Sequence, residues 1–236
     1  MFGRILVAAV ISGLLAGVAF TGLQAVKVLP LIWAAEAYEG AEATPAAHAH
    51  PTAESPAAHT HGDEAWAPED GGERIAFTLL ANVLIGIGFA LLLCAGFAFK
   101  GQIDWRKGVI WGLLGYVVFQ LAPAFGLPPE LPGMRAADVD ARQIWWVATV
   151  AATAGGLSLI FLLSPTIWKA AGIALIALPH VVGAPHLPIE QAAALPAELA
   201  AAFVSASLVT NLIFWLLLGG LSAFAFTRIN ARSATA

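Results

Sequence analysis

Charged side chains are scarce in this sequence. Only 11% of its 236 residues are Asp, Glu, Lys or Arg, whereas 59% are hydrophobic. A soluble domain carries about 25% charged residues, so this composition excludes an ordinary soluble protein and predicts a chain embedded in lipid. The few basic residues are scattered along the chain and form no basic run, so we expect no nucleic-acid partner.

Cysteine and nucleotide-binding motifs are equally sparse. The lone cysteine, Cys94, lies in an apolar run, which excludes a disulfide framework or cysteine-based zinc site and predicts a buried thiol. No Gly-x-x-x-x-Gly-Lys-Ser/Thr motif is present, so nucleotide hydrolysis by a P-loop is excluded. Ser158 with His180 matches no nucleophile signature, and only one predicted span carries histidine for a haem. We therefore expect no enzyme and no prosthetic group.

Long apolar segments predict an all-α polytopic membrane bundle of about six transmembrane helices, with five as the alternative count. In the first segment Ala9, Gly13 and Gly17 recur every fourth residue, a small-residue stripe that lets another helix approach closely. A signal peptide cleaved near Ala35 is the alternative for this segment, but its apolar run is long, and we favour a retained span. The predicted spans are residues 5–29, 75–99, 108–125, 143–163, 167–182 and 199–226.

The distribution of Lys and Arg predicts the orientation of this bundle. With six spans and the N-terminus in the cytoplasm, the cytoplasmic basic residues are Arg4, Lys100, Arg106, Lys107, Lys169, Arg228 and Arg232. The outer basic residues are Lys27, Arg74, Arg135 and Arg142. The excess of basic residues on the predicted cytoplasmic side satisfies the positive-inside rule. It predicts a multi-pass protein of the bacterial inner membrane. The predicted units are a first helix in 1–35, an outer loop in 36–74, the remaining bundle in 75–227 and a cytoplasmic tail in 228–236.

The predicted outer loop, residues 36–74, is rich in histidine and acidic residues. It has few residues that could build a core, so we expect a disordered segment. In an extended chain positions i and i+2 project to the same side, so each His-x-His pair can present two imidazoles to one ion. Imidazole suits copper, zinc, nickel and cobalt. The alternative is a low-complexity linker with incidental histidines. The candidate metal ligands here are His48, His50, His59 and His61.

Three further candidate ligands lie outside this loop. His180 and His186 lie at the outer end of the fifth predicted span, where prolines are expected to interrupt the helix. Broken helices at membrane depth often mark substrate sites. An interfacial histidine in an ordinary exit turn is the alternative, most of all for His186. Glu130, within a proline-rich turn, could approach from the same outer face or be a solvated carboxylate. Polar groups inside the spans, namely Asn82, Gln120 and Gln24, are expected to bond across helices.

The chain as a whole resembles the family of probable cobalt transporter subunits called CbtA. The resemblance covers most of the chain and includes the histidine-bearing first loop. It also rests on Met1-Phe2-Gly3-Arg4-Ile5-Leu6, Gly126-Leu127-Pro128-Pro129-Glu130-Leu131-Pro132-Gly133, Arg142-Gln143-Ile144-Trp145-Trp146, and Leu178-Pro179-His180 with Gly183-Ala184-Pro185. It implies membrane uptake of Co²⁺ for cobalamin synthesis, with a small His-rich membrane subunit of the CbtB type as partner. The family is described with five spans, and residues 167–182 are the segment that such a count omits.

These observations lead to one hypothesis and one rival. The loop histidines capture a divalent ion, most readily Co²⁺ with Ni²⁺ as the alternative, and pass it to a site near His180 and Glu130. The rival is a metal-binding or scaffold subunit that conducts nothing, because no carboxylate is found inside the predicted spans, where a dication would need one.

Overall fold

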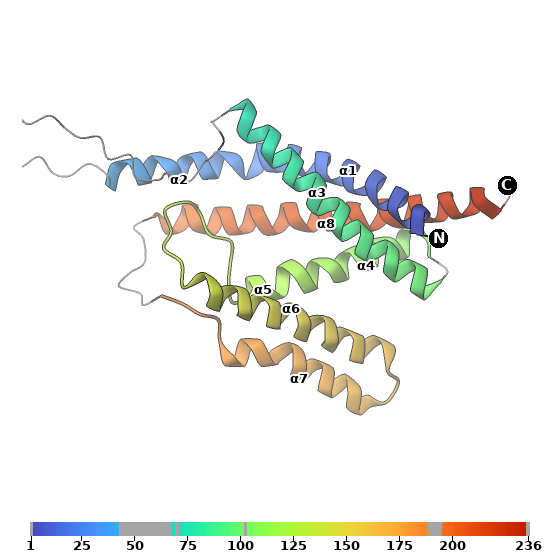
Figure 1. Cartoon of the computed structure of the whole chain (residues 1–236). Coiled ribbons are helices and arrows are strands. Elements are labelled where there is room, and N and C mark those ends of the chain that lie inside the picture. Colours follow the sequence, from blue (N-terminus) through green and yellow to red (C-terminus); the bar gives the residue numbers. More distant parts are fainter. Residues whose placement is uncertain (1, 43–67, 69–70, 102, 188–194, 235–236) are drawn as a thin grey trace, which may run out of the picture.

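The computed structural model describes residues 2–42, 68, 71–101, 103–187 and 195–234. Within these ranges every regular element is helical (Figure 1), which confirms the predicted all-α class. The elements are α1 (Phe2–Lys27), α2 (Leu29–Glu42), α3 (Gly72–Lys100), α4 (Trp105–Tyr116), the π-helix η1 (Val117–Leu121), α5 (Ala122–Ala124), α6 (Val139–Leu162), α7 (Thr166–Val182) and α8 (Ala197–Ala234). By length and composition, five stretches of this described chain could cross a membrane: Phe2–Lys27, Gly72–Lys100, Trp105–Ala124, Val139–Leu162 and Ala197–Ala231.

The chain ends on the side of the bundle where it begins. Arg4 Nη1 donates a hydrogen bond of 3.2 Å to Asn230 Oδ1, and both termini lie at the same end in Figure 1. This requires an even number of passes, and α7 adds the sixth by running back along α6. With 17 residues, α7 is about 25 Å long, short of the ~30 Å hydrocarbon core. The described helices therefore run along the bundle six times, and five of these stretches are long and apolar enough to cross a membrane.

The helical segment before the predicted outer loop extends further than the sequence predicted. Helix α2 continues through Glu42, so residues 36–42 are helical rather than part of a loop. The Leu31 N–H donates to the Val28 carbonyl at 3.0 Å, which carries the helical path across the junction between α1 and α2. Pro30 lies in the first turn of α2, where its missing N–H costs little. The helical path therefore continues from α1 through the turn at Val28 into α2.

Packing of α2 against the rest of the fold explains this extension. Ala35, beside the considered cleavage site, is fully buried. It belongs to a small apolar cluster with Val28, Leu131 and Phe203, which ties α2 to α8 and to the proline-rich turn. Helix α8 in turn continues over residues 228–234, so most of the predicted tail is a helical extension of the last span.

Close contacts at glycines hold the core helices together. A Cβ added to Gly13 would stand 2.5 Å from the Cα of Ile87 in α3, and one added to Gly17 would stand 2.7 Å from the Cα of Val83. Such distances are too short for real carbon atoms, so only glycine fits. The predicted small-residue stripe is thus confirmed as the contact between α1 and α3. Helix α4 meets the backbone of α8 in the same way at Gly112.

The core of the described chain consists of α1, α3, α4 and α8, and the α6–α7 hairpin lies to one side (Figure 1). Phe97 and Leu218 are fully buried in this core, and Cys94 is a buried free thiol, as predicted. Helix α7 packs mainly against α6, and α6 reaches the other elements through η1 and α5. The hairpin is therefore joined to the core along one narrow side.

Polar side chains between α1 and α3 bond to one another. Asn82 Nδ2 donates to Thr21 Oγ1 at 3.0 Å and to Gln24 Oε1 at 2.6 Å. The Thr21 hydroxyl in turn donates to the Gly17 carbonyl at 2.9 Å. The predicted interhelical bonding is confirmed for Asn82 and Gln24. These hydrogen bonds stabilise the contact between α1 and α3 inside the bundle.

Candidate functional site

The described metal-ligand candidates lie at one end of the bundle. The predicted histidine-rich loop includes Glu42, where α2 ends, and Gly72, where α3 begins, and both lie at the end where α5 and α7 also finish (Figure 1). Glu130 follows α5, while His180 and His186 lie at and just beyond the end of α7. The loop candidates, His48, His50, His59 and His61, lie outside the described residues.

A cavity of about 660 Å³ opens at this end between the η1–α5 segment, the proline-rich turn and the start of α6. Its walls are mixed: apolar residues such as Phe119 and Trp146 supply most of the lining, and four polar residues supply the rest. Glu130 is the only acidic residue among those lining it. The polar residues are Gln120, Glu130, Arg142 and Gln143.

Glu130 and Arg142 form an ion pair inside this cavity. Arg142 Nη2 donates to Glu130 Oε2 at 2.6 Å, and their side chains keep only 28% and 26% of their exposure. Asp138 caps α6 by accepting from the Ala141 N–H at 3.0 Å, which fixes the first turn of the helix that carries Arg142. The Arg142 Nε is buried and has no partner among the described residues. The guanidinium is thus held by one carboxylate alone.

A π-helical segment, η1, forms one wall of the cavity. Pro123 has no N–H, so the Phe119 carbonyl loses its helical donor, and the Ala122 N–H bonds instead to the Val117 carbonyl. π-Bulges of this kind occur frequently at functional sites. Gln120 lies in this segment and lines the cavity. Its predicted bond across helices is absent among the described residues, which leaves its amide available to a ligand.

His180 lies against aromatic rings on the last turn of α7. Its ring centroid is 5.8 Å from that of Trp145 and 6.2 Å from that of Phe125, both edge-on. Trp145 Nε1 donates to the Pro179 carbonyl at 3.2 Å, which anchors this end of α7 to α6. The expected interruption by proline does not occur at Pro179: the helix continues through it to Val182, where the predicted span also ended, and Gly183 follows with a φ of 87°.

The described candidate ligands lie at the same end of the bundle but do not line one common site. His180 is absent from the lining of the Glu130 cavity, and His186 is exposed beyond α7. Within the described ranges no group of three or more His, Cys, Asp or Glu could hold a metal ion. A site with three such ligands therefore needs residues outside these ranges or from a second chain, and the joint ligand set remains a prediction.

Sequence reasoning missed the role of Arg142. It lies twelve residues from its carboxylate partner, across a proline-rich turn whose path no periodicity predicts. The sequence does contain a clue to this pair: an acidic residue lies between prolines, and a basic residue follows in the first turn of the next helix. The π-segment at Gln120 could have been suspected from Pro123 near the end of an apolar span.

The ion pair gives a stability prediction. Glu130→Ala and Arg142→Ala should each lower the free energy of unfolding by about 1–3 kcal/mol, because either leaves a half-buried charge unpaired. The double variant should lose less than the sum of the two single losses. Thermal unfolding of the purified protein in detergent micelles measures this coupling. Lys107→Ala, in an exposed pair 3.8 Å from Asp104, serves as control and should change little. Additive losses would show that the two side chains do not interact.

The fold and this site define a multi-pass helical membrane protein with an ion-paired cavity at one end of its bundle. The chain belongs to the CbtA family, described as probable cobalt transporter subunit, whose family model matches residues 2–227. No curated protein and no solved structure matches. Membership of this family implies a probable cobalt transporter subunit, with a transport role, a metal ion as substrate and a complex with other subunits.

Proposed function

We propose that this chain is the metal-receiving subunit of a transporter that takes up Co²⁺ across the bacterial inner membrane. The observation that carries this proposal is that the candidate ligands lie at one end of the bundle and most of the basic residues at the other (Figure 1). Four basic residues, Lys27, Arg74, Arg135 and Arg142, lie toward the ligand-bearing end. Glu130, His180 and His186 share one end with the flanks of the histidine-rich loop. The other end holds Arg4, Lys100, Arg106, Lys107, Lys169 and Arg228. By the positive-inside rule the basic end faces the cytoplasm, and the ligand-bearing end faces the arriving ion.

The loop histidines make the first contact with the ion in this proposal. The pairs His48/His50 and His59/His61 can each present two imidazoles to one ion, and imidazole suits Co²⁺ and also Ni²⁺. Ordering a long loop around an ion costs conformational entropy. Capture is therefore of modest affinity, which allows release to the next ligands.

His180 and Glu130 are the next ligands in this proposal. The imidazole of His180 has no hydrogen-bond partner among the described residues, so its ring nitrogens can bind a metal. Glu130 supplies the negative charge, but Arg142 holds it at 2.6 Å. An arriving dication must share the Glu130 carboxylate with the Arg142 guanidinium or displace the guanidinium from it. The cavity around the pair, with Gln120 on its wall, gives room for that exchange.

A second candidate function is a subunit that receives metal and conducts nothing. In the described helices Asp and Glu occur only near helix ends or within α2, and none lies mid-span in a membrane-crossing helix. A dication inside the bilayer is expected to need such ligands. A small His-rich partner of the CbtB type would then complete the path.

Uptake of radioactive Co²⁺ into proteoliposomes tests the proposal. The wild type is compared with a deletion of residues 42–70, with His180→Ala, and with His186→Ala as the matched exposed imidazole. The deletion should slow uptake several-fold at low cobalt and little at saturating cobalt, because capture limits only the former. His180→Ala should reduce uptake at every concentration, and His186→Ala should resemble wild type.

The same assay separates the two candidate functions. Flux through this chain alone supports a self-sufficient transporter. No flux alone, but flux once the other subunits of the complex are added, supports the non-conducting subunit. Uptake that is unaffected by both the loop deletion and His180→Ala would contradict the proposed capture route. Competition by Ni²⁺ measures the choice between the two metals.

A further inference from the structure

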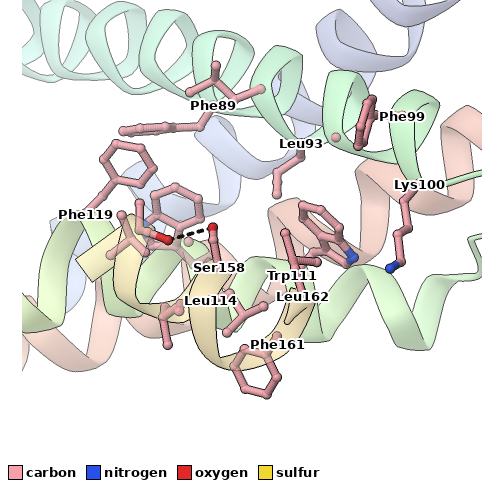
Figure 2. A pocket seen from close by; sticks show the side chains of 17 residues that line it. Phe89, Leu93, Phe99, Lys100, Trp111, Leu114, Phe119, Ser158, Phe161 and Leu162 are labelled. Carbon is pink, nitrogen blue, oxygen red and sulfur yellow. Dashed lines mark hydrogen bonds between the residues drawn. The ribbon is translucent and has the colours of Figure 1, made fainter. Parts of the chain in front are cut away.

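An apolar groove of about 620 Å³ separates α3 from α6, in the half of the bundle nearer the basic end (Figure 2). Its walls are hydrocarbon and aromatic surface, supplied by residues such as Phe89, Leu93, Leu114, Phe161 and Leu162. It arises because the α6–α7 hairpin joins the core only through η1 and α5. Beyond that junction α6 and α3 do not pack against each other.

The groove offers nothing to a hydrated ion along its length. Ser158 is the only hydroxyl residue lining it, and that hydroxyl donates to the Ala154 carbonyl of its own helix at 2.8 Å (Figure 2). Such a surface is complementary to a hydrocarbon chain. It is therefore separate in chemistry from the ion-paired cavity at Glu130.

One end of the groove is basic. Lys100 lines that end, and Figure 2 shows its ammonium on the side of the Trp111 indole nitrogen. Lys100 and Trp111 also line an adjoining cavity of about 400 Å³, together with Lys107. Neither Lys100 nor the Trp111 N–H has an ion-pair or hydrogen-bond partner among the described residues. Three donors thus surround the point where the apolar groove opens.

One acid lies close to these donors and does not cancel them. Asp104 is 3.8 Å from Lys107 Nζ, with both side chains more than half exposed, and such pairs contribute little. Its carboxylate accepts from the Lys107 and Arg106 N–H groups at 3.0 and 2.9 Å. The Lys107 bond first, and the Arg106 bond after it, lowers the pKa of Asp104. Asp104 is thus engaged as the helix cap, and Lys100, Arg106 and Lys107 leave this end positive.

We propose that this groove binds an anionic phospholipid, with one acyl chain between α3 and α6 and its phosphate on Lys100 and Lys107. Basic pockets between membrane helices on the cytoplasmic side bind lipid head groups in this manner. The Trp111 N–H then donates to an oxygen at the head-group level, as indoles at membrane interfaces do.

The charge at the mouth of the groove favours a phospholipid over an apolar protein helix. A phospholipid brings an acyl chain for the apolar walls and a phosphate for Lys100 and Lys107 in one molecule. The charge at the groove's end then selects an anionic lipid over a zwitterionic one.

Native mass spectrometry of the full-length protein in detergent tests this proposal, with phosphatidylglycerol and phosphatidylcholine of identical chains as probes. The wild type should bind one phosphatidylglycerol more tightly than phosphatidylcholine. Lys100→Gln with Lys107→Gln should weaken phosphatidylglycerol binding by about 25-fold, about fivefold per lysine. The same change should weaken phosphatidylcholine binding much less, because the choline offsets the charge of its phosphate. Lys169→Gln, an exposed lysine at the same end outside the groove, should change neither.

A second variant tests the groove itself. Ser158→Phe places a ring in the groove and should weaken both lipids, whereas Ala174→Phe on the exposed face of α7 should weaken neither. Equal binding of the two lipids, unchanged by the lysine substitutions, would overturn the proposal. The proposal would also be overturned if Ser158→Phe converted a dimer to a monomer and left lipid binding intact. The groove would then hold a second copy of the chain.

Discussion

Gly13→Val is expected to prevent stable folding of the bundle. A Cβ at this position would stand 2.5 Å from the Cα of Ile87 and 2.7 Å from the carbonyl carbon of Gly86. These are backbone atoms of α3, which cannot rotate away as a side chain could. Overpacking of a core costs typically 1–3 kcal/mol, and here the two helices must separate along their main contact, so we expect a loss of at least about 3 kcal/mol.

Gly22→Val is the matched control, because it makes the same change in the same helix where no atom lies within 4 Å of the new Cβ. Thermal unfolding and size-exclusion profiles in detergent should show Gly13→Val as aggregated or unfolded and Gly22→Val as near wild type. A stable, monodisperse Gly13→Val protein would mean that α1 and α3 do not meet as described.

Glu130→Gln is expected to lower Co²⁺ uptake by at least about tenfold, the scale on which residues beside a metal site affect activity. Glu130 is the only acid lining its cavity. The amide keeps an oxygen that can accept from Arg142, so the local fold persists, but it no longer offers a negative charge to a dication. This prediction rests on the proposed uptake route.

Asp140→Asn makes the same chemical change at the same end of the bundle. Asp140 is exposed in the first turn of α6, two positions before Arg142, and does not line the cavity. Initial rates of cobalt uptake, normalised to folded protein in the vesicle, should fall for Glu130→Gln alone. Equal rates for the two variants would remove Glu130 from the path of the ion.

The sequence predicted the features that depend on local composition. Spans follow from apolar length, and most of the helices lie within a few residues of the predicted segments, although α8 continues to Ala234. The stripe at Gly13 and Gly17 was recognised because small residues every fourth position form one face of a helix. Interhelical hydrogen bonds were expected for Asn82 and for Gln24 because a polar group inside a span is stabilised by a polar partner on another helix, but their pairing with each other was not predicted. Each inference uses only residues within one helix.

Features that depend on packing between distant segments could not be predicted in this way. The extension of α2 through residues 36–42 follows from burial of Ala35 beside Phe203, a contact made across most of the chain. The pairing of Glu130 with Arg142 depends on the path of a proline-rich turn. His180 reaches the ring of Trp145 only because α6 and α7 form a hairpin.

The hydrogen bond between Arg4 and Asn230 joins residues 226 positions apart, and it has a consequence for the order of synthesis. Helix α8 packs against both α1 and α4, and Phe214 of α8 faces Phe20 of α1 at 4.7 Å between ring centroids. During membrane insertion α1 therefore lacks its contacts with α8 until α8, the last helix, has been synthesised. Earlier spans have no complete core until then, and a chain truncated before α8 leaves α1 and α4 without their shared partner.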